Sequence, residues 1–291
     1  MITNNSSNIE IYIGLRGPTF ISIIEKVLSK GLKKKYITQI LNDPENINIF
    51  SQVFTHESAY PERPDFNYEI YEQLGDLTAN KFIVHYMYNR FPQLKCTFGL
   101  KIVARLRINY GSKQSFYKIA EKLGFWDFIT ISTEKKSKEM KDTLEDVFEA
   151  FIGALEFIVD SKFEVGVGYA IVSKILKYIF DEIDISLSYE NLYDPKTRLK
   201  ELFNYRQDLG TIKYEETISI TEFGKITISD VFIISVDNKK KKIGTGSASL
   251  KKDSQQHASK HALAYLKNLG IFKIEPPEYA LLSLESLPPF L

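Results

Sequence analysis

The chain has 291 residues, a formal net charge of +1, 44% hydrophobic residues and 26% charged residues. This length and composition are typical of a globular protein with one large or two modest domains. Because no stretch of about eighteen uncharged apolar residues occurs, no membrane-spanning helix is expected. The N-terminus lacks the basic start and apolar core of a secretory signal, and the single cysteine, Cys96, excludes an internal disulfide. Both features favour a cytoplasmic location.

The small net charge conceals an uneven distribution along the chain. Residues 194–270 carry 14 Lys and Arg against 9 Asp and Glu, a net charge of +5, so the remainder of the chain sums to −4. A basic segment joined to an acidic one suits a polyanion-binding module beside a cation-binding one. On charge alone, chance fluctuation is an alternative explanation.

In chain order, the first 35 residues are predicted to form a leader, with a Gly-Pro break at residues 17–18 and a short helical pattern over residues 20–32. Apolar residues then recur mostly at helical spacing as far as residue 180, with few strand-like alternations. We therefore predict an all-α domain over residues 36–185. Turn signals separate its helices, at residues 61–64, 91–92, 111–112 and 124 and in the charged run 134–141.

The periodicity changes in the last third of the chain. After a predicted linker over residues 186–193, the pair Asp194-Pro195 is typical of a helix start. Residues 251–269 return to helical spacing after three alternating or β-branched segments. These predicted strands are residues 212–220, 226–236 and 241–249. We therefore predict a small α+β domain of order α-β-β-β-α over residues 194–270, followed by a tail over residues 271–291.

Two of the predicted helices carry acidic residues among apolar ones. Glu69, Glu72 and Asp76 are spaced i, i+3 and i+7, and therefore project from one face of a helix. Asp146 and Glu149, spaced i and i+3, do the same on a second helix. Burying these acids together would be costly unless a cation such as Mg²⁺ neutralised them. Such a site suits phosphodiester hydrolysis, although the spacing alone is also common on solvated helix faces.

Three segments of the helical domain resemble sequence motifs of the ribonuclease III family. Residues 72–76, Glu-Gln-Leu-Gly-Asp, resemble the E-x-L-G-D centre of the family signature. Residues 54–58, Phe-Thr-His-Glu-Ser, resemble its LTHRS segment, and residues 146–154 resemble its second acidic helix, D-x-F-E-A-L-I-G-A. The intervening helices also fit, and the matches follow the family's order over roughly residues 36–180.

The resemblance implies both a fold and an activity. It implies an all-α endonuclease domain that cleaves double-stranded RNA by two-metal-ion hydrolysis, leaving 5′-phosphate and 3′-hydroxyl ends. It also implies Mg²⁺ as the cofactor, with Mn²⁺ able to substitute. Glu69 matches an additional acidic position near the scissile bond and is a further catalytic candidate. Metal coordination is assigned to four catalytic acids, Glu72, Asp76, Asp146 and Glu149.

Other positions near these acids have two interpretations each, or depart from the family. Gly75 permits a close helix approach or is a plain packing glycine. His56 is interpreted as a structural histidine in preference to a general base, since a metal-activated water needs none. Tyr68 replaces the usual Asn, and Gln73 replaces an aromatic residue that inserts into the partner subunit of family homodimers. We still predict a homodimer formed through the endonuclease domain.

The basic segment resembles a double-stranded-RNA-binding domain. Residues 194–204 resemble its first helix, D-x-K-T-x-L-Q-E, and residues 244–258 resemble its G-x-G-x-S-K-K-x-A segment. Lys251 and Lys252, at the start of the last helix, are predicted to face phosphates. Residues on one face of the first helix are predicted to reach 2′-hydroxyls in the minor groove of double-stranded RNA. These residues are Thr197, Lys200, Glu201 and Asn204.

The same segment also departs from the usual pattern. Leu250 and Ser254 replace Ser and Ala, Lys200 replaces Gln, and the usual minor-groove loop residues are missing from residues 220–227. The lysine run 239–242 is interpreted either as additional phosphate contacts or as a solvated cluster on a hairpin. Binding to duplex RNA is expected to weaken steeply with salt in either case.

Three hypotheses follow from the sequence. The leading one is a Mg²⁺-dependent endoribonuclease that acts on double-stranded RNA. The second is a non-catalytic protein that sequesters duplex RNA and keeps the helical domain as a dimerisation scaffold. The third is a subunit of a larger RNA-processing assembly that docks through the leader or the tail. A composition rich in Lys, Ile, Tyr, Phe and Asn suits an AT-rich genome, such as that of a large DNA virus.

Overall fold

A computed structural model of the chain describes residues 9–222, 224–235, 237–274 and 279. The chain divides into two compact units, Met1–Ile185 and Ser186–Leu291. The start of the predicted leader and most of the predicted tail over residues 271–291 lie outside the described residues. No helix in the described part of the chain has the length and apolar character that a membrane span requires.

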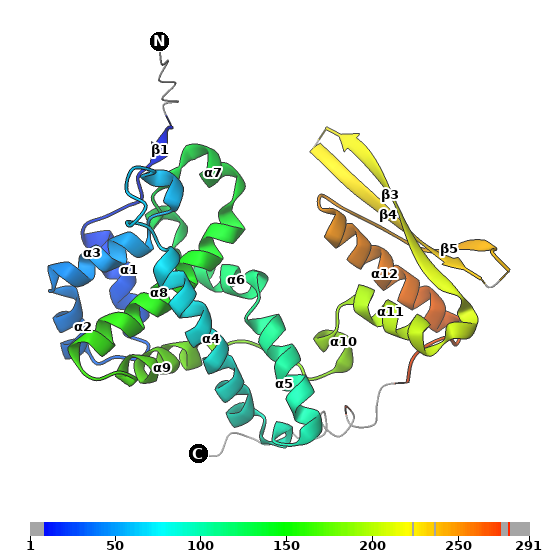
Figure 1. The fold of residues 1–291 in the computed structure, drawn as a ribbon, viewed down its shortest axis with the longest axis horizontal. Helices are drawn as coiled ribbons and strands as arrows, with labels where there is room; N and C mark the ends of the chain where they lie inside the picture. The colour runs from blue at the N-terminus through cyan, green and yellow to red at the C-terminus, as the bar shows by residue number, and fades with distance from the viewer. Residues whose placement is uncertain (1–8, 223, 236, 275–278, 280–291) are drawn as a thin grey trace, which may run out of the picture. The chain divides into compact units, whose positions relative to one another are not determined.

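The first unit is helical, which confirms the predicted all-α class, with one short antiparallel pair of strands (Figure 1). This pair joins β1 (Ile11–Tyr12) to β2 (Ile131–Ser132). Short 3-10 turns lie at Glu57–Ala59, Pro92–Leu94 and Trp126–Phe128. The α-helices are α1 (Pro18–Leu28), α2 (Lys34–Leu41), α3 (Pro44–Val53), α4 (Glu69–Arg90), α5 (Thr97–Tyr110), α6 (Lys113–Leu123), α7 (Thr133–Lys138), α8 (Met140–Lys162) and α9 (Val167–Asp181).

Helix α8 forms the centre of the first unit. Its residues from Thr143 to Val159 are mostly buried, because apolar residues occur on every side of the helix. Helices α3, α4, α6 and α9 pack around it. The ring centroid of Phe151 on α8 lies 5.5 Å from that of Phe50 and 5.4 Å from that of Phe125. This aromatic packing fixes α8 within the unit and so fixes the acids that it carries.

Two sequence predictions about the first unit need correction. The charged run over residues 134–141 was predicted to be a turn, but it forms most of α7 and the start of α8. Ion pairs at helical spacing, such as Lys138 with Glu134 at 2.7 Å, support α7 where apolar periodicity is missing. The short helical pattern of the predicted leader forms α1, and its buried Phe20 and Ile24 belong to the core of the first unit.

The second unit has the predicted order of helix, three strands and helix, which confirms the α+β class. Its sheet is antiparallel in the order β3-β4-β5 (Figure 1). Helices α11 and α12 supply most of its buried core, together with Val231 and Ile243 from the sheet. A short helix, α10, lies inside the predicted linker. The elements are α10 (Tyr189–Leu192), α11 (Pro195–Tyr205), β3 (Thr211–Thr221), β4 (Gly224–Ile234), β5 (Lys240–Ala248) and α12 (Lys251–Asn268), with a 3-10 turn at Gln207–Leu209.

Local sequence explains why these elements form where they do. Asp194 caps α11 by accepting a hydrogen bond from the backbone N–H of Thr197 at 3.0 Å, and Pro195 occupies the first helical position. Gly244 and Gly246 let β5 approach α12, since a Cβ at either position would lie within 2.4 Å of the backbone of Ala258. The glycines of the G-x-G segment therefore serve packing between the sheet and α12.

Candidate active site

Helices α4 and α8 cross with their backbones in direct contact. A Cβ added at Gly75 of α4 would lie 1.7 Å from the carbonyl oxygen of Glu149 on α8. A Cβ added at Gly153 of α8 would lie 2.1 Å from the carbonyl oxygen of Tyr71 on α4. No side chain larger than hydrogen fits at either position without moving a helix. The sequence left two interpretations of Gly75 open, and this contact favours the close helix approach.

This crossing brings together the four acids that the sequence assigned to metal coordination. Glu72 and Asp76 lie on α4 on either side of Gly75, and Asp146 and Glu149 lie on α8. Glu149 is only 6% exposed, whereas the other three are partly exposed. Each helix therefore contributes two acids at the crossing, one of the four buried and the other three accessible.

The pKa values of these acids reflect their burial and their proximity. Burial raises the pKa of Glu149 to about 9, with further contributions from Asp76, Glu145, Glu72 and Asp146 in that order. Burial likewise raises the pKa of Glu72 to about 7, and Asp146 is the largest charged contributor. Each carboxylate therefore makes ionisation of its neighbours unfavourable. A cation bound among them would remove this cost.

Two of the acids are held by hydrogen bonds from side chains that the sequence did not single out as functional. The hydroxyl of Tyr68, which is 4% exposed, donates to Asp146 Oδ2 at 2.9 Å. Burial raises the pKa of Asp146, and this hydrogen bond opposes the shift. On α4, the Asn80 amide donates to Asp76 Oδ1 at 2.6 Å, and Arg107 donates to the Asn80 side-chain oxygen at 3.2 Å. These contacts orient one acid from each helix.

The donor set fits a hard divalent cation such as Mg²⁺, because it consists of carboxylate oxygens. The positions of these side chains, however, are not yet those of a metal site. In the described part of the chain, no group of three or more Asp, Glu, His or Cys side chains is already gathered at metal-binding positions. Cation binding at the crossing would therefore require the four carboxylates to turn toward one another, as expected of like charges that otherwise repel.

Other charged and titratable residues surround the crossing. Glu69 begins α4, is exposed, and has a pKa raised first by burial and then by Glu57. Lys113 of α6 lies 2.9 Å from Asp142 and 3.2 Å from Glu145, so it neutralises acids at the start of α8 without contacting the four ligand candidates. Its charge also acts on Asp146, where it opposes the upward pKa shift caused by burial.

His56 has a structural environment. It is buried, its Nδ1 accepts a hydrogen bond from the backbone N–H of Ser58 at 2.9 Å, and its ring packs against that of Tyr68 at 5.6 Å. Burial lowers its pKa, with Lys135 as the next contribution, so the neutral form that accepts this hydrogen bond is favoured. This geometry agrees with the structural interpretation of His56.

The candidate RNA-binding residues lie on two helices of the second unit. On α11, Lys200 and Asn204 are exposed and Thr197 donates its hydroxyl to the capping carboxylate of Asp194 at 2.6 Å. The carboxylate of Glu201 accepts hydrogen bonds from Tyr189 and from Lys273, the latter at 2.9 Å. The first helix therefore offers two exposed polar side chains and two that are engaged within the unit.

At the start of α12, Lys251 and Lys252 are both exposed. Lys251 lies 3.3 Å from Glu216, whereas no ion pair of Lys252 with an acid occurs among the described residues. Lys252 is therefore the better placed of the two for a phosphate.

The lysine run 239–242 is largely neutralised within the second unit. Lys240 lies 2.6 Å from Glu215, Lys242 lies 2.7 Å from Asp230, and Lys239 lies 2.8 Å from Asp237. The fourth, Lys241, lies over the ring of Tyr265. Of the two interpretations of this run, the structure favours the solvated cluster, in which most of the lysines are paired with nearby acids (self-compensated lysines).

The acid-bearing helix pair and the basic α-β-β-β-α unit together define a nuclease joined to a nucleic-acid-binding module. The family model described as Ribonuclease III domain matches residues 69–157. The model described as Double-stranded RNA binding motif matches residues 195–266. The chain belongs to the ribonuclease III family.

Similar proteins occur in viruses and bacteria. The chain is 40% identical over 279 residues to "Putative ribonuclease 3" of Invertebrate iridescent virus 6, which covers 90% of this chain and 93% of that relative. It is 29% identical over 228 residues to "Ribonuclease 3" of Limosilactobacillus fermentum, covering 76% of this chain and 91% of the relative. Among solved structures, the nuclease domain of ribonuclease III from Campylobacter jejuni is 26% identical, covers 57% of this chain and 99% of that one, and has a TM-score of 0.42.

Proposed function

We propose that this protein is an endoribonuclease that cleaves double-stranded RNA by Mg²⁺-dependent, two-metal-ion hydrolysis, with Mn²⁺ able to replace Mg²⁺. The products would carry 5′-phosphate and 3′-hydroxyl ends. The observation that carries the proposal is the contact of α4 and α8 at Gly75 and Gly153, which holds two pairs of carboxylates together. A cytoplasmic location is proposed with it.

In this mechanism the four acids Glu72, Asp76, Asp146 and Glu149 hold the cations. Bound divalent cations would activate a water and stabilise the charge that develops on the phosphate. Tyr68 and Asn80 hold the carboxylates of Asp146 and Asp76 in place. Burial of Glu149 makes its charged form dependent on a nearby cation. Glu69, exposed at the start of α4, is proposed to lie beside the scissile bond.

The second unit would supply affinity for duplex RNA. Lys252 and Lys251 at the start of α12 are proposed to contact phosphates, because they are exposed and lie at a helix N-terminus. Lys200 and Asn204 are proposed to contact the minor groove from α11, together with Thr197 and Glu201. Recognition of this kind reads the shape of an A-form helix and little of its base sequence.

A homodimer is proposed to form through the first unit, because cleavage of both strands of a duplex calls for two sites. An apolar patch on α4 and α8 supports this proposal. Its side chains are between 43% and 66% exposed, which is unusual for residues of this size beside an acidic site. The ring of Phe157 on α8 packs against that of Tyr71 on α4, with ring centroids 5.9 Å apart, and so connects the two helices at the patch. The patch consists of Ile70, Leu74, Leu77 and Phe157.

The proposed function is tested by incubating a labelled, perfectly paired RNA duplex with Mg²⁺ and either the wild-type protein or the Glu149→Gln variant. The wild type is expected to cut, and the variant is expected to bind the duplex with unchanged affinity while its cleavage rate falls at least a hundredfold. Replacing Mg²⁺ by EDTA should stop wild-type cleavage. If both proteins bind the duplex and neither cuts it, the protein sequesters duplex RNA and the nuclease proposal is wrong.

A further inference from the structure

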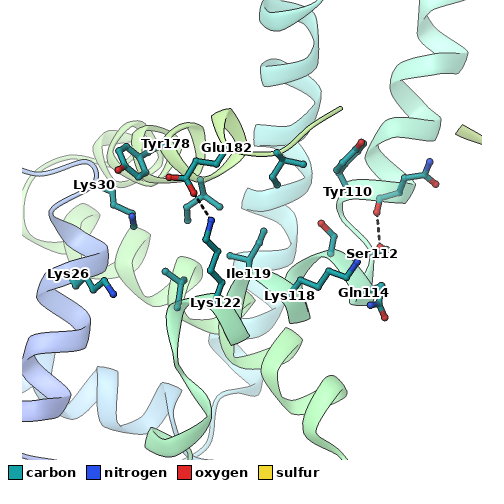
Figure 2. Close-up of a pocket in the computed structure, with 15 residues that line it drawn as sticks. Lys26, Lys30, Tyr110, Ser112, Gln114, Lys118, Ile119, Lys122, Tyr178 and Glu182 are labelled. Atoms are coloured by element: carbon teal, nitrogen blue, oxygen red, sulfur yellow. Dashed lines mark hydrogen bonds and ion pairs between the residues drawn. The ribbon is translucent and has the colours of Figure 1, made fainter. Parts of the chain in front are cut away.

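The first unit contains a second candidate binding site, a cavity of about 480 Å³ that lies among α1, α5, α6 and α9. None of its lining residues is one of the four acids on α4 and α8. Figure 2 shows Lys26 of α1 and Lys30, just after the end of α1, reaching toward it from one side and Lys118 and Lys122 of α6 from another. Its volume lies in the range typical of small-molecule sites, about 300–1,000 Å³.

The walls of this cavity are strongly basic. Four lysines and a single acid, Glu182, line it, a net charge of +3. Lys122 is paired with Glu182 at 2.6 Å, and Lys30 lies 4.1 Å from the ring centroid of Tyr178. No hydrogen bond or ion pair of the side-chain ammonium group of Lys26 or Lys118 occurs within the part of the chain that the structure describes. At least two positive charges are therefore uncompensated at the cavity, which attracts anions.

The cavity also offers apolar and aromatic surface. It is lined by Ile119 and Leu123 of α6, Ile179 of α9 and Ile183, which follows α9. Tyr178 contributes an exposed ring at its edge. A simple anion would use the lysines and leave this surface unfilled. A ligand that combines a planar, weakly polar ring with negative charges matches both halves of the lining.

We propose that this cavity binds a nucleotide, with its terminal phosphates among Lys26, Lys30 and Lys118 and its base against Tyr178 and the neighbouring isoleucines. A double helix is too wide and too stiff to enter a cavity of this size, so the proposed ligand is distinct from the duplex substrate. The group that the cavity would recognise, a nucleotide with terminal phosphates, occurs both as a free nucleotide in solution and at the 5′ end of a single-stranded RNA. The site is independent of the proposed nuclease activity.

The test is isothermal titration of the full-length protein with ATP in EDTA, which keeps divalent cations from the acids on α4 and α8. The Lys26→Glu, Lys118→Glu double variant is compared with a Lys101→Glu, Lys174→Glu control that changes the same charge at exposed positions outside the cavity. The cavity variant is expected to weaken ATP binding at least tenfold, and the control at most twofold. Circular dichroism checks that both variants are folded.

Four further ligands identify what the cavity recognises. Adenosine and inorganic triphosphate are each expected to bind at least tenfold more weakly than ATP. Adenosine contacts only the apolar and aromatic part of the cavity wall, and triphosphate contacts only the basic part. Displacement of ATP by a 5′-triphosphorylated single-stranded oligoribonucleotide, but not by its 5′-hydroxyl form, would identify an RNA end as the source. Failure of both to displace ATP would identify the free nucleotide. No ATP binding at millimolar concentration, equal binding by triphosphate, or equal loss in the control variant would overturn the proposal.

Discussion

At Glu149, a carboxyl group is buried beside three other acids that share the crossing of α4 and α8. Its pKa is raised from 4.5 to about 9 in the folded protein, so the folded state binds the proton more tightly than the unfolded state. The stabilisation from this protonated form is complete below the unfolded pKa and is lost as the pH rises through the folded value. The melting temperature of the metal-free protein is therefore expected to fall by several degrees between pH 5 and about 9.

The Glu149→Gln variant should flatten this pH dependence, because the glutamine cannot ionise. Thermal unfolding in EDTA, followed by circular dichroism across this pH range, measures the difference. Glu164→Gln, a change of the same kind at an exposed position, serves as the control and should follow the wild type. Equal slopes for all three proteins would show that Glu149 is not the source of the pH dependence.

Tyr68 acts on the site through another residue, since its hydroxyl donates to Asp146 and is itself shielded from water. Removing the hydroxyl in Tyr68→Phe should leave the fold intact and weaken divalent-cation binding by about 10- to 100-fold, the effect typical of partners that orient metal ligands. Titration with Mn²⁺, followed by the electron paramagnetic resonance signal of the free ion, measures this affinity directly. Tyr71→Phe on the same helix is the matched control, and an identical Mn²⁺ affinity in both variants would contradict the assignment.

At the scale of the element, the crossing of α4 and α8 leaves no room for a side chain at Gly153. In Gly153→Ala the new methyl group would meet the carbonyl oxygen of Tyr71, so the helices must separate. A loss of stability of about 1–3 kcal/mol is expected, as for other overpacked cores, together with weaker Mn²⁺ binding. Urea denaturation measures the first effect. Asn89→Ala, at an exposed position of α4, is the control, and a Gly153→Ala protein as stable as this control would disprove the contact.

Helical and strand elements could be predicted where local pattern and tertiary burial agree. The start of α11 was found because Asp194 and Pro195 form a local cap, and the strands of the second unit because their residues alternate. Helix α7 was missed, since ion pairs between neighbouring turns stabilise it without an apolar face. The pairing of Ile11 with Ser132 joins residues that are far apart in the sequence, and no local signal marks it.

The candidate site was predicted to a similar extent. Glu72 and Asp146 were recognised because motif and spacing coincide, and the structure places both at the helix crossing. The supporting residues Tyr68 and Asn80 were not recognised, since a hydrogen bond from a side chain depends on how two helices pack. The departure from the family's Asn at Tyr68 was the one signal in the sequence. Nothing in local sequence indicates that Glu201 contacts Tyr189 and Lys273 within its own unit.

For the whole molecule, the apolar patch on α4 and α8 is the surface on which dimerisation would depend. Leu77 is 66% exposed and lies one turn from Leu74 on the same patch. Leu77→Glu places a charge that cannot be buried there, so the variant is expected to sediment as a monomer and to cleave duplex RNA at least tenfold more slowly. Leu100→Glu, at a similarly exposed leucine of α5, is the control and should remain dimeric. A dimeric Leu77→Glu protein would place the interface elsewhere.

The self-compensated lysines of β5 have a consequence for how strongly the protein responds to salt. When a lysine is already paired with a carboxylate, that carboxylate competes with RNA phosphates for the ammonium group. Such a lysine therefore releases few of the cations that are condensed on the RNA. Lys240 is paired with Glu215 and Lys242 with Asp230. The second unit therefore contains more basic side chains than are free to contact RNA. Salt is therefore expected to weaken the binding of a duplex by the second unit less than the composition of that unit suggests.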